Sequence, residues 1–207
     1  MNLFSDSITD GEPIPGEYAF CVPDPDEHVA MAANRSPHLG WTNVPDGVRS
    51  FAVLCVDVDV PTVGDDVNQE GKTVPEDLER TDFYHWVLVD IPPSRRELAE
   101  GLDSDGVTPR GKDVGQTEYG VRGRNDYTDW FAGDDEMEGV YGGYDGPCPP
   151  WNDERIHRYH FRVYALDVAT LGLQGEFGGS EAREAIQGHV LAESEIVGTY
   201  TLNPDLT

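Results

Sequence analysis

Four titratable side chains fall on strand faces that are otherwise apolar. Asp57 and Asp59 continue the apolar face of a predicted strand at 50–59. His85 and His157 each begin the apolar face of a further predicted strand. A titratable group at the edge of a buried face costs free energy unless it is paired. If the three strands are neighbours, we therefore expect the two carboxylates and the two imidazoles to hydrogen-bond with one another.

This combination of side chains predicts an anion-binding pocket. A carboxylate that accepts from one imidazole nitrogen favours the protonated ring and leaves the other N–H free for an incoming anion. Tyr159 lies two residues after His157, on the same face, and can donate its hydroxyl to the same ligand. Glycines at 142–146 let backbone N–H groups approach an anion closely. The predicted pocket for a phosphate-like or carboxylate group comprises Asp57, Asp59, His85, Gly146, His157 and Tyr159.

Each of these features also has a simpler interpretation. An Asp-x-Asp sequence at a strand end is typical of a turn or a solvated edge, and the glycine run at 139–146 is by itself only a loop. Four histidines are interpreted as loop, exposed-face or helix-packing residues: His28, His38, His160 and His189. Sequence spacing alone does not bring the site-bearing strands together.

Period-two alternation of apolar residues dominates the chain and predicts a mainly β protein. The predicted strands are 50–59, 85–91, 157–166 and 195–202. The first strand is apolar on both faces, so both are expected to be buried, whereas 157–166 is expected to keep one solvated face. Several strands separated by turn residues, with few helices, predict a β-sandwich or barrel in a single domain, 1–207.

Helices and long loops complete the predicted organisation. One helix is expected at 181–192 with Ser180 as its N-cap, and a shorter helical turn at 94–101. Two long irregular segments, 62–82 and 101–150, have the length of functional or mobile loops.

The composition is strongly acidic, with 14 Lys and Arg against 40 Asp and Glu and a formal net charge of −26. Nucleic acids and anionic membranes bind clustered Lys and Arg, so neither is an expected partner and no stable membrane association is predicted. Four Trp, nine Tyr and seven Phe supply a core and argue against disorder. We expect a folded, halophilic protein in a salt-rich cytoplasm, where screening relieves the repulsion between surface charges.

Targeting signals and metal-site spacings are not evident in the sequence. Residues 1–10 carry no Lys or Arg and no apolar run of signal-peptide length, and no run approaches the roughly 20 apolar residues that span a bilayer. These features predict a soluble, cytoplasmic protein. Cys21, Cys55 and Cys148 are too scattered for a disulfide framework or a zinc site, so reduced thiols are expected. No cofactor and no resident metal is predicted.

Two functions fit the predicted pocket. A small binding protein would capture a phosphorylated or other anionic group, alone or on a protein partner that it modulates. A phosphoester hydrolase would use the same carboxylates and histidines to hold a divalent metal or to perform acid–base catalysis. The chain shows no serine nucleophile elbow, no metal-spaced histidine pair on a helix and no P-loop. Binding is therefore the leading hypothesis and hydrolysis the alternative.

Several short motifs occur in order along the chain. They are NRSPHLGWTNVP at 34–45, VDVDVP at 56–61, His85-Trp86, YDGPCPP at 144–150, His157-Arg158-Tyr159, and GHVLAE at 188–193 with GTY at 198–200. In this order they resemble the phosphatidylethanolamine-binding protein family, in particular its Raf kinase inhibitor-like branch from bacteria and archaea, over nearly the whole chain.

The resemblance implies an antiparallel β-sandwich with a few peripheral helices and an anion pocket at one end. The residues that it implies for the pocket are Asp57, Asp59, His85, His157 and Tyr159, which the analysis of strand faces also selected. It further suggests phospholipid headgroups as ligands, disfavoured at anionic bilayers by the charge of −26, and a homodimer as the oligomeric form.

The sequence departs from the family pattern in two places. Val58 replaces the first proline of the Asp-Pro-Asp-x-Pro signature, which restores a backbone N–H and loosens the local backbone constraint. An acidic insertion at about 62–82 separates Pro61 from His85 and is placed to cover or extend the pocket. The resemblance also suggests a cis bond between Val60 and Pro61.

Overall fold

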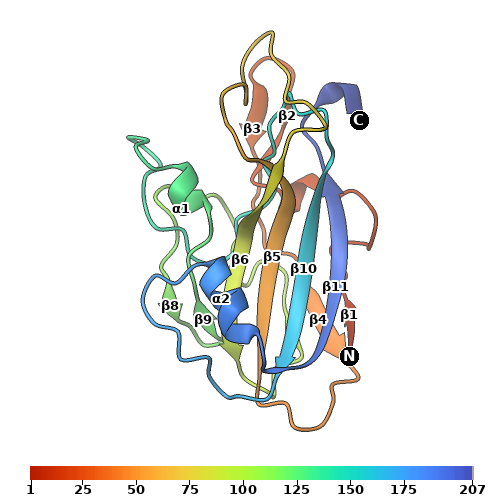
Figure 1. Ribbon diagram of the computed structural model, residues 1–207, viewed down its shortest axis with the longest axis vertical. Helices are drawn as coiled ribbons and strands as arrows, with labels where there is room; N and C mark the ends of the chain where they lie inside the picture. Colours follow the sequence, from red (N-terminus) through yellow and green to blue (C-terminus); the bar gives the residue numbers. More distant parts are fainter. Residues whose placement is uncertain (207) are drawn as a thin grey trace.

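Two antiparallel sheets pack face to face in the computed structural model, which describes residues 1–206 (Figure 1). The larger sheet has the order β11-β10-β5-β6-β9-β8. Its strands are β5 (Ser50–Pro61), β6 (Arg80–Ile91), β8 (Gly115–Gln116), β9 (Val121–Arg122), β10 (His157–Leu166) and β11 (Val190–Tyr200). The smaller sheet contains β1 (Asn2–Phe4), β4 (Leu39–Thr42) and β7 (Glu97–Leu98). The predicted β-sandwich is confirmed.

The remaining elements are short and lie around the sandwich. They are the β2–β3 hairpin (Cys21–Asp24 and His28–Met31), the helices α1 (Tyr127–Trp130) and α2 (Gly179–Ile186), and the 3-10 turns Gly16–Tyr18 and Pro204–Leu206. The β2–β3 hairpin lies at the upper end of the molecule, near the carboxyl terminus, and α2 crosses one face of the large sheet (Figure 1). No helix within residues 1–206 has the length and apolar character needed to cross a membrane.

The central strand β5 is buried on both faces, as its sequence predicts. Its odd-numbered residues join the core shared with the small sheet, where Phe51 packs against Trp41 with ring centroids 5.2 Å apart. Its even-numbered residues, including Leu54, face a second cluster that contains Ala182 and Ile186 of α2. Burial on both sides explains why the strand reads as a nearly continuous apolar run.

Three of the predicted strands are direct neighbours, which is the condition that the predicted site required. In the sheet register, Asp57 of β5 pairs with Tyr159 of β10 on one side and with Phe83 of β6 on the other. Strand β10 has the predicted bounds, and β5 and β6 extend beyond theirs to Pro61 and back to Arg80. The polar ends of β5, β6 and β10 therefore lie side by side at one end of the sheet.

Three local predictions were wrong. The helix α2 ends at Ile186 instead of residue 192, because Gln187 is extended and Gly188 has a positive φ of 86°, and β11 begins at Val190. Its N-cap is Gly178 instead of Ser180. The segment 94–101 holds strand β7 instead of a helical turn, since Leu98 is buried opposite β4.

The peptide bond between Val60 and Pro61 is trans, as are the others in the described chain, so the predicted cis bond was wrong. Both residues remain in the ladder between β5 and β6, where Val60 is paired with Thr81 and Pro61 with Arg80. An extended trans chain satisfies this pairing.

Candidate ligand-binding site

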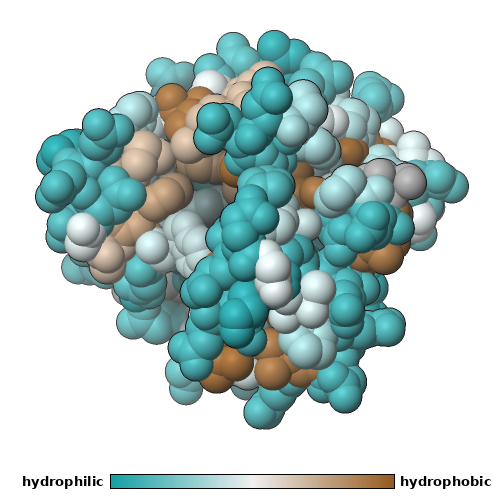
Figure 2. Space-filling model, turned by 90° about the horizontal axis from the view of Figure 1, so that it is seen from above, coloured by the Kyte–Doolittle hydropathy of each residue, from teal (hydrophilic) through white to brown (hydrophobic). Residues whose placement is uncertain are grey.

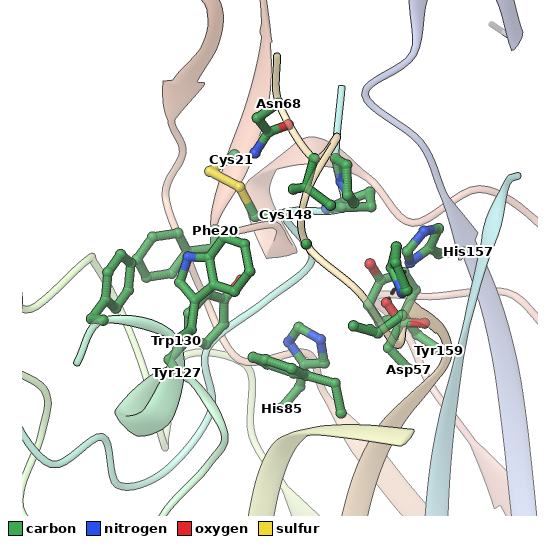
Figure 3. A pocket seen from close by; sticks show the side chains of 18 of the residues that line it. Phe20, Cys21, Asp57, Asn68, His85, Tyr127, Trp130, Cys148, His157 and Tyr159 are labelled. Carbon is green, nitrogen blue, oxygen red and sulfur yellow. Dashed lines mark hydrogen bonds and ion pairs between the residues drawn. A yellow bond between two sulfur atoms is a disulfide. The ribbon is translucent and has the colours of Figure 1, made fainter. Parts of the chain in front are cut away.

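A cavity of about 320 Å³ lies at the end of the sandwich where β5, β6 and β10 meet the β2–β3 hairpin. A hollow bordered by apolar side chains is seen on this end of the molecule in Figure 2. Aromatic and aliphatic residues form most of the wall: Phe20, Met31, Val60, Pro61, Val67, Phe83, Tyr127, Trp130, Phe131, Pro149 and Pro150. Four polar side chains face the cavity from the strand ends: Asp57, His85, His157 and Tyr159 (Figure 3).

A buried chain of charges begins at the cavity and runs into the protein. Nδ1 of His157 donates to Asp57 Oδ2 at 2.7 Å, and its Nε2 donates to Asp153 Oδ2 at 3.1 Å. Arg80 donates two hydrogen bonds to the same Asp153 carboxylate, at 2.5 and 3.0 Å. Burial opposes a charge on His157, but the two carboxylates outweigh it and raise the pKa of the ring to about 9. His157 is therefore an imidazolium held between two carboxylates.

His85 is buried in a different protonation state. Its Nδ1 lies 2.8 Å from the backbone oxygen of Asp145, to which it donates, and none of the hydrogen bonds in residues 1–206 uses its Nε2. Burial lowers the pKa of His85 below its ordinary value, although Asp57 and the Asp145 carbonyl act to raise it. The ring is therefore neutral at pH 7, with the Nε2 lone pair toward the cavity, where the ring points in Figure 3.

A second network fixes the residue that orients His85. The carboxylate of Asp145 is buried and accepts from Lys112 Nζ at 2.7 Å, from Asn34 Nδ2 at 2.7 Å and from Asn125 Nδ2 at 2.9 Å. With its side chain fully bonded, Asp145 holds its carbonyl in place for the imidazole of His85. Such outer contacts fix the tautomer of a site histidine.

The hydroxyl of Tyr159 is the one polar atom of the cavity that is buried without a hydrogen-bond partner in the described chain. Its ring packs edge-on against His85, with centroids 5.2 Å apart. Burial raises the pKa of the phenol well above its ordinary value, and the Asp57 carboxylate, which lies close to the hydroxyl without completing a hydrogen bond, raises it further, so the hydroxyl keeps its proton. A buried donor without a partner is costly, and it points to a group that the site receives.

The comparison with known proteins identifies the family. A family model described as phosphatidylethanolamine-binding protein matches residues 4–201. The chain belongs to this family. It is 32% identical to a UPF0098 protein of Aquifex aeolicus over 200 residues, which cover 97% of this chain and 88% of the relative. A UPF0098 protein of Methanothermobacter thermautotrophicus is also 32% identical, with coverage of 97% and 98%.

Solved structures of the family share the fold. Escherichia coli YbcL, described as a new member of the mammalian family, has a TM-score of 0.69 and 25% identity, and the match covers 97% of each chain. CT736 of Chlamydia trachomatis, described as a putative phosphatidylethanolamine-binding protein homologue, has a TM-score of 0.64 and 27% identity, with coverage of 96% and 95%. The resemblance inferred from the sequence is confirmed.

Two residues of the predicted pocket, Asp59 and Gly146, lie outside the cavity lining. The carboxylate of Asp59 accepts from Arg158 at 2.8 and 2.9 Å and from Arg155 at 3.1 Å, so its charge is neutralised away from the cavity. The N–H of Gly146 donates to Asn34 Oδ1 at 2.8 Å and is not available to a ligand. The second N–H expected to remain free on His157 is also engaged, by Asp153.

The acidic insertion in the family pattern forms one wall of the cavity. Gly64, Val67 and Asn68 line it. The insertion is anchored by the buried Asn152, whose Nδ2 donates to the Asp66 and Lys72 carbonyls at 2.8 and 3.0 Å and whose Oδ1 accepts from Asn68 N at 2.9 Å. Residues of the segment 62–82 therefore form part of the cavity wall, and the sequence left open whether they would cover or extend the pocket.

A disulfide joins two walls of the cavity, so the prediction of three reduced thiols was wrong. Cys21 of β2 is bonded to Cys148, and their Cα atoms are 4.9 Å apart across a sequence separation of 127 residues. Backbone hydrogen bonds from Phe20 and Cys21 to the Pro147 carbonyl bring the two segments together. Cys55 is a buried free thiol whose pKa is raised well above its ordinary value by burial.

Sequence reasoning missed the partners that complete the charge chain. Arg80 and Asp153 lie in irregular or strand-end positions without a periodic pattern, and no motif marks them. The one signal available was the spacing of Asp153 four residues before His157, which is meaningful only once the turn between them is known. Among residues 1–206, no group of three or more His, Cys, Asp or Glu side chains is arranged to hold a metal ion.

Proposed function

We propose that this protein is a binding protein that captures a small ligand through an acidic group, either a phosphate or a carboxylate. The group would bind at the floor of the cavity, which is formed by Asp57, His85, His157 and Tyr159. The observation that carries the proposal is the Tyr159 hydroxyl, buried at the floor without a partner. An oxygen of the ligand would accept from it. Nε2 of His85 and the carboxylate of Asp57 stand beside it as further polar contacts.

The walls favour a ligand whose acidic group carries an apolar part. Most of the cavity lining is aromatic or aliphatic, and Trp130 and Met31 at the rim remain 54% and 58% exposed. A volume of about 320 Å³ lies within the range of small-molecule sites. The same chemistry is offered by a free metabolite, by a phospholipid headgroup and by a phosphorylated side chain of a protein partner. The charge of −26 disfavours an anionic bilayer as the source.

Isothermal titration calorimetry in molar KCl tests the proposal. The ligands are inorganic phosphate, phosphorylethanolamine and acetate, and the variant is Tyr159→Phe. A hydrogen bond to a charged group contributes about 1.5–3 kcal/mol, so the variant is expected to bind roughly 10- to 100-fold more weakly. Tyr164→Phe is the matched control, since Tyr164 lies on the same strand but in the cluster on the opposite face of the sheet. Equal affinity of Tyr159→Phe and wild type, or no binding of any of the three ligands, would contradict the proposal.

Hydrolysis of phosphoesters by the same residues has one candidate base in the cavity, the neutral imidazole of His85. Both ring nitrogens of His157 are held by carboxylates, so the ring cannot accept a proton from a substrate. No serine or threonine is among the cavity-lining residues of the described chain. Release of phosphate from phosphorylethanolamine during the same titrations would revive the hydrolase alternative.

A further inference from the structure

No uncompensated positive charge from residues 1–206 lies at the floor of the cavity. The imidazolium of His157 and the guanidinium of Arg80 are matched by the carboxylates of Asp57 and Asp153, two cations against two anions in one bonded chain. Both ring N–H groups of His157 are directed at these carboxylates. An anion that enters the cavity therefore finds no free cation to neutralise it.

His85 faces the same space as a hydrogen-bond acceptor. Donation of Nδ1–H to the Asp145 carbonyl leaves a lone pair on Nε2, and the ring is neutral at pH 7. A fully deprotonated oxyanion would thus meet two acceptors, the imidazole of His85 and the carboxylate of Asp57, and one donor, the hydroxyl of Tyr159. Acceptors that face one another without a proton between them repel.

Within the part of the chain that the structure describes, the surroundings of His85 add no further unpaired charge to these donors and acceptors. The titratable groups that face it are Asp57 of β5, His157 and Tyr159 of β10, Tyr127 of α1 and Asp145 of the loop before Gly146. Asp145 is neutralised by Lys112, and the Tyr127 hydroxyl donates to the Gly146 carbonyl at 2.8 Å. Phe83, on the same strand as His85, contributes an apolar ring 4.9 Å from the imidazole.

We propose that binding of the acidic group is coupled to the uptake of one proton, which is held between a ligand oxygen and Nε2 of His85. The inference rests on the proposed function and adds to it the protonation state that the site accepts. A ligand that brings its own proton, such as the dihydrogenphosphate monoanion or the hydrogenphosphate dianion, satisfies the site directly. A ligand that is fully deprotonated, such as sulfate, binds only when His85 takes a proton from solvent.

Thermodynamic linkage between proton binding at His85 and sulfate binding determines how the affinity for sulfate changes with pH. Burial lowers the pKa of His85 in the empty cavity, and an anion in contact with Nε2 raises it. Between these two values one proton is taken up for each sulfate bound, so the dissociation constant of sulfate is expected to increase about tenfold for each unit that the pH rises. Phosphate, which can carry the proton itself, is expected to bind more tightly than sulfate at pH 7 and to lose this advantage as the pH falls toward 5.

Calorimetry of the wild-type protein with sulfate measures the proton directly. Titrations are run at pH 7 in two buffers with different heats of ionisation, in molar KCl. The apparent enthalpy is expected to differ between the buffers by an amount that corresponds to about one proton per sulfate. His85→Gln, whose amide supplies both a donor and an acceptor, is expected to bind sulfate without a buffer-dependent heat. The control is His160→Gln on β10, because His160 bonds Glu195 outside the cavity and its loss should leave the proton uptake unchanged.

The outcomes separate this inference from the function on which it rests. Sulfate that binds with the same heat in both buffers would overturn the proton coupling and leave anion capture intact. If sulfate binds at no pH between 5 and 8 while phosphate, phosphorylethanolamine or acetate does, the proton coupling alone is overturned. If none of the four binds, both proposals are overturned. The wild-type titrations decide between these outcomes even if His85→Gln does not fold.

Discussion

Replacing Tyr159 by phenylalanine is expected to stabilise the free protein while it weakens ligand binding. The hydroxyl is buried and has no hydrogen-bond partner in the described chain, so removing it relieves an uncompensated desolvation cost. Such a cost is about 1–3 kcal/mol for a neutral donor. The ring stays in place because its edge-on contact with His85 does not involve the oxygen. An increase of about 1 kcal/mol in the free energy of unfolding corresponds to a rise of about 2–4 °C in Tm for a chain of this size.

Denaturant unfolding in molar KCl, followed by tryptophan fluorescence, measures the change. Tyr200→Phe is the matched control, because the buried Tyr200 hydroxyl donates to the Cys21 carbonyl at 2.8 Å. That variant loses a hydrogen bond and is expected to be destabilised by about 1 kcal/mol. If Tyr159→Phe were destabilised to the same extent as Tyr200→Phe, the Tyr159 hydroxyl would be bonded within the free protein. The inference that the hydroxyl is unbonded in the free protein and available to a ligand would then be refuted.

Three further predictions follow from the charges and the cysteines. The stability contributed by His157 is expected to be complete below its ordinary pKa of 6.5 and to be lost as the pH rises to about 9, an effect on the order of 3 kcal/mol. In urea unfolding at a series of pH values, Asp153→Asn should move this loss to lower pH, and an unchanged profile would contradict the assignment. Titration of thiols in the unfolded protein should find one before reduction, Cys55, and three after it; three from the start would disprove the Cys21–Cys148 disulfide. Because the net charge is −26, Tm is expected to rise between dilute buffer and molar KCl, and a constant Tm would contradict the proposed role of screening.

The sheet was predictable from the sequence where alternation is uninterrupted. Strand β10 was predicted with its observed bounds, because inward residues such as Tyr159 and Phe161 alternate with exposed Arg158. The neighbourhood of β5, β6 and β10 was not derivable from periodicity and came from the family resemblance. Pairing between distant strands depends on the whole topology, which local spacing does not encode.

The error at Asp59 has a local cause. A strict period of two places Asp59 on the same face as Asp57, but the β5–β6 register shifts between Asp57 and Val60. An irregularity of this kind turns a side chain away from the face that alternation assigns to it. Here the carboxylate is directed to Arg158 and Arg155, and the Asp59 N–H donates to Asp57 Oδ1 at 2.8 Å.

The loop-built parts of the site depend on contacts that are remote in sequence. The wall from the insertion is fixed by Asn152, more than 80 residues from its partner Asn68. The disulfide joins cysteines separated by 127 residues. Neither contact leaves a local pattern, so a prediction from spacing alone treats Asn152 as an ordinary turn residue and the cysteines as isolated thiols.

The burial of the Asp57–His157–Asp153–Arg80 chain separates the site from the ionic conditions outside. Dissolved ions screen interactions between solvated charges, but they weaken the interactions of buried ion pairs much less. The exterior of the protein can therefore respond to salinity through its many carboxylates while the cavity floor keeps the same charge. The charges and pairing of these four residues are therefore expected to be the same in brine and in dilute solution, provided that the fold itself persists.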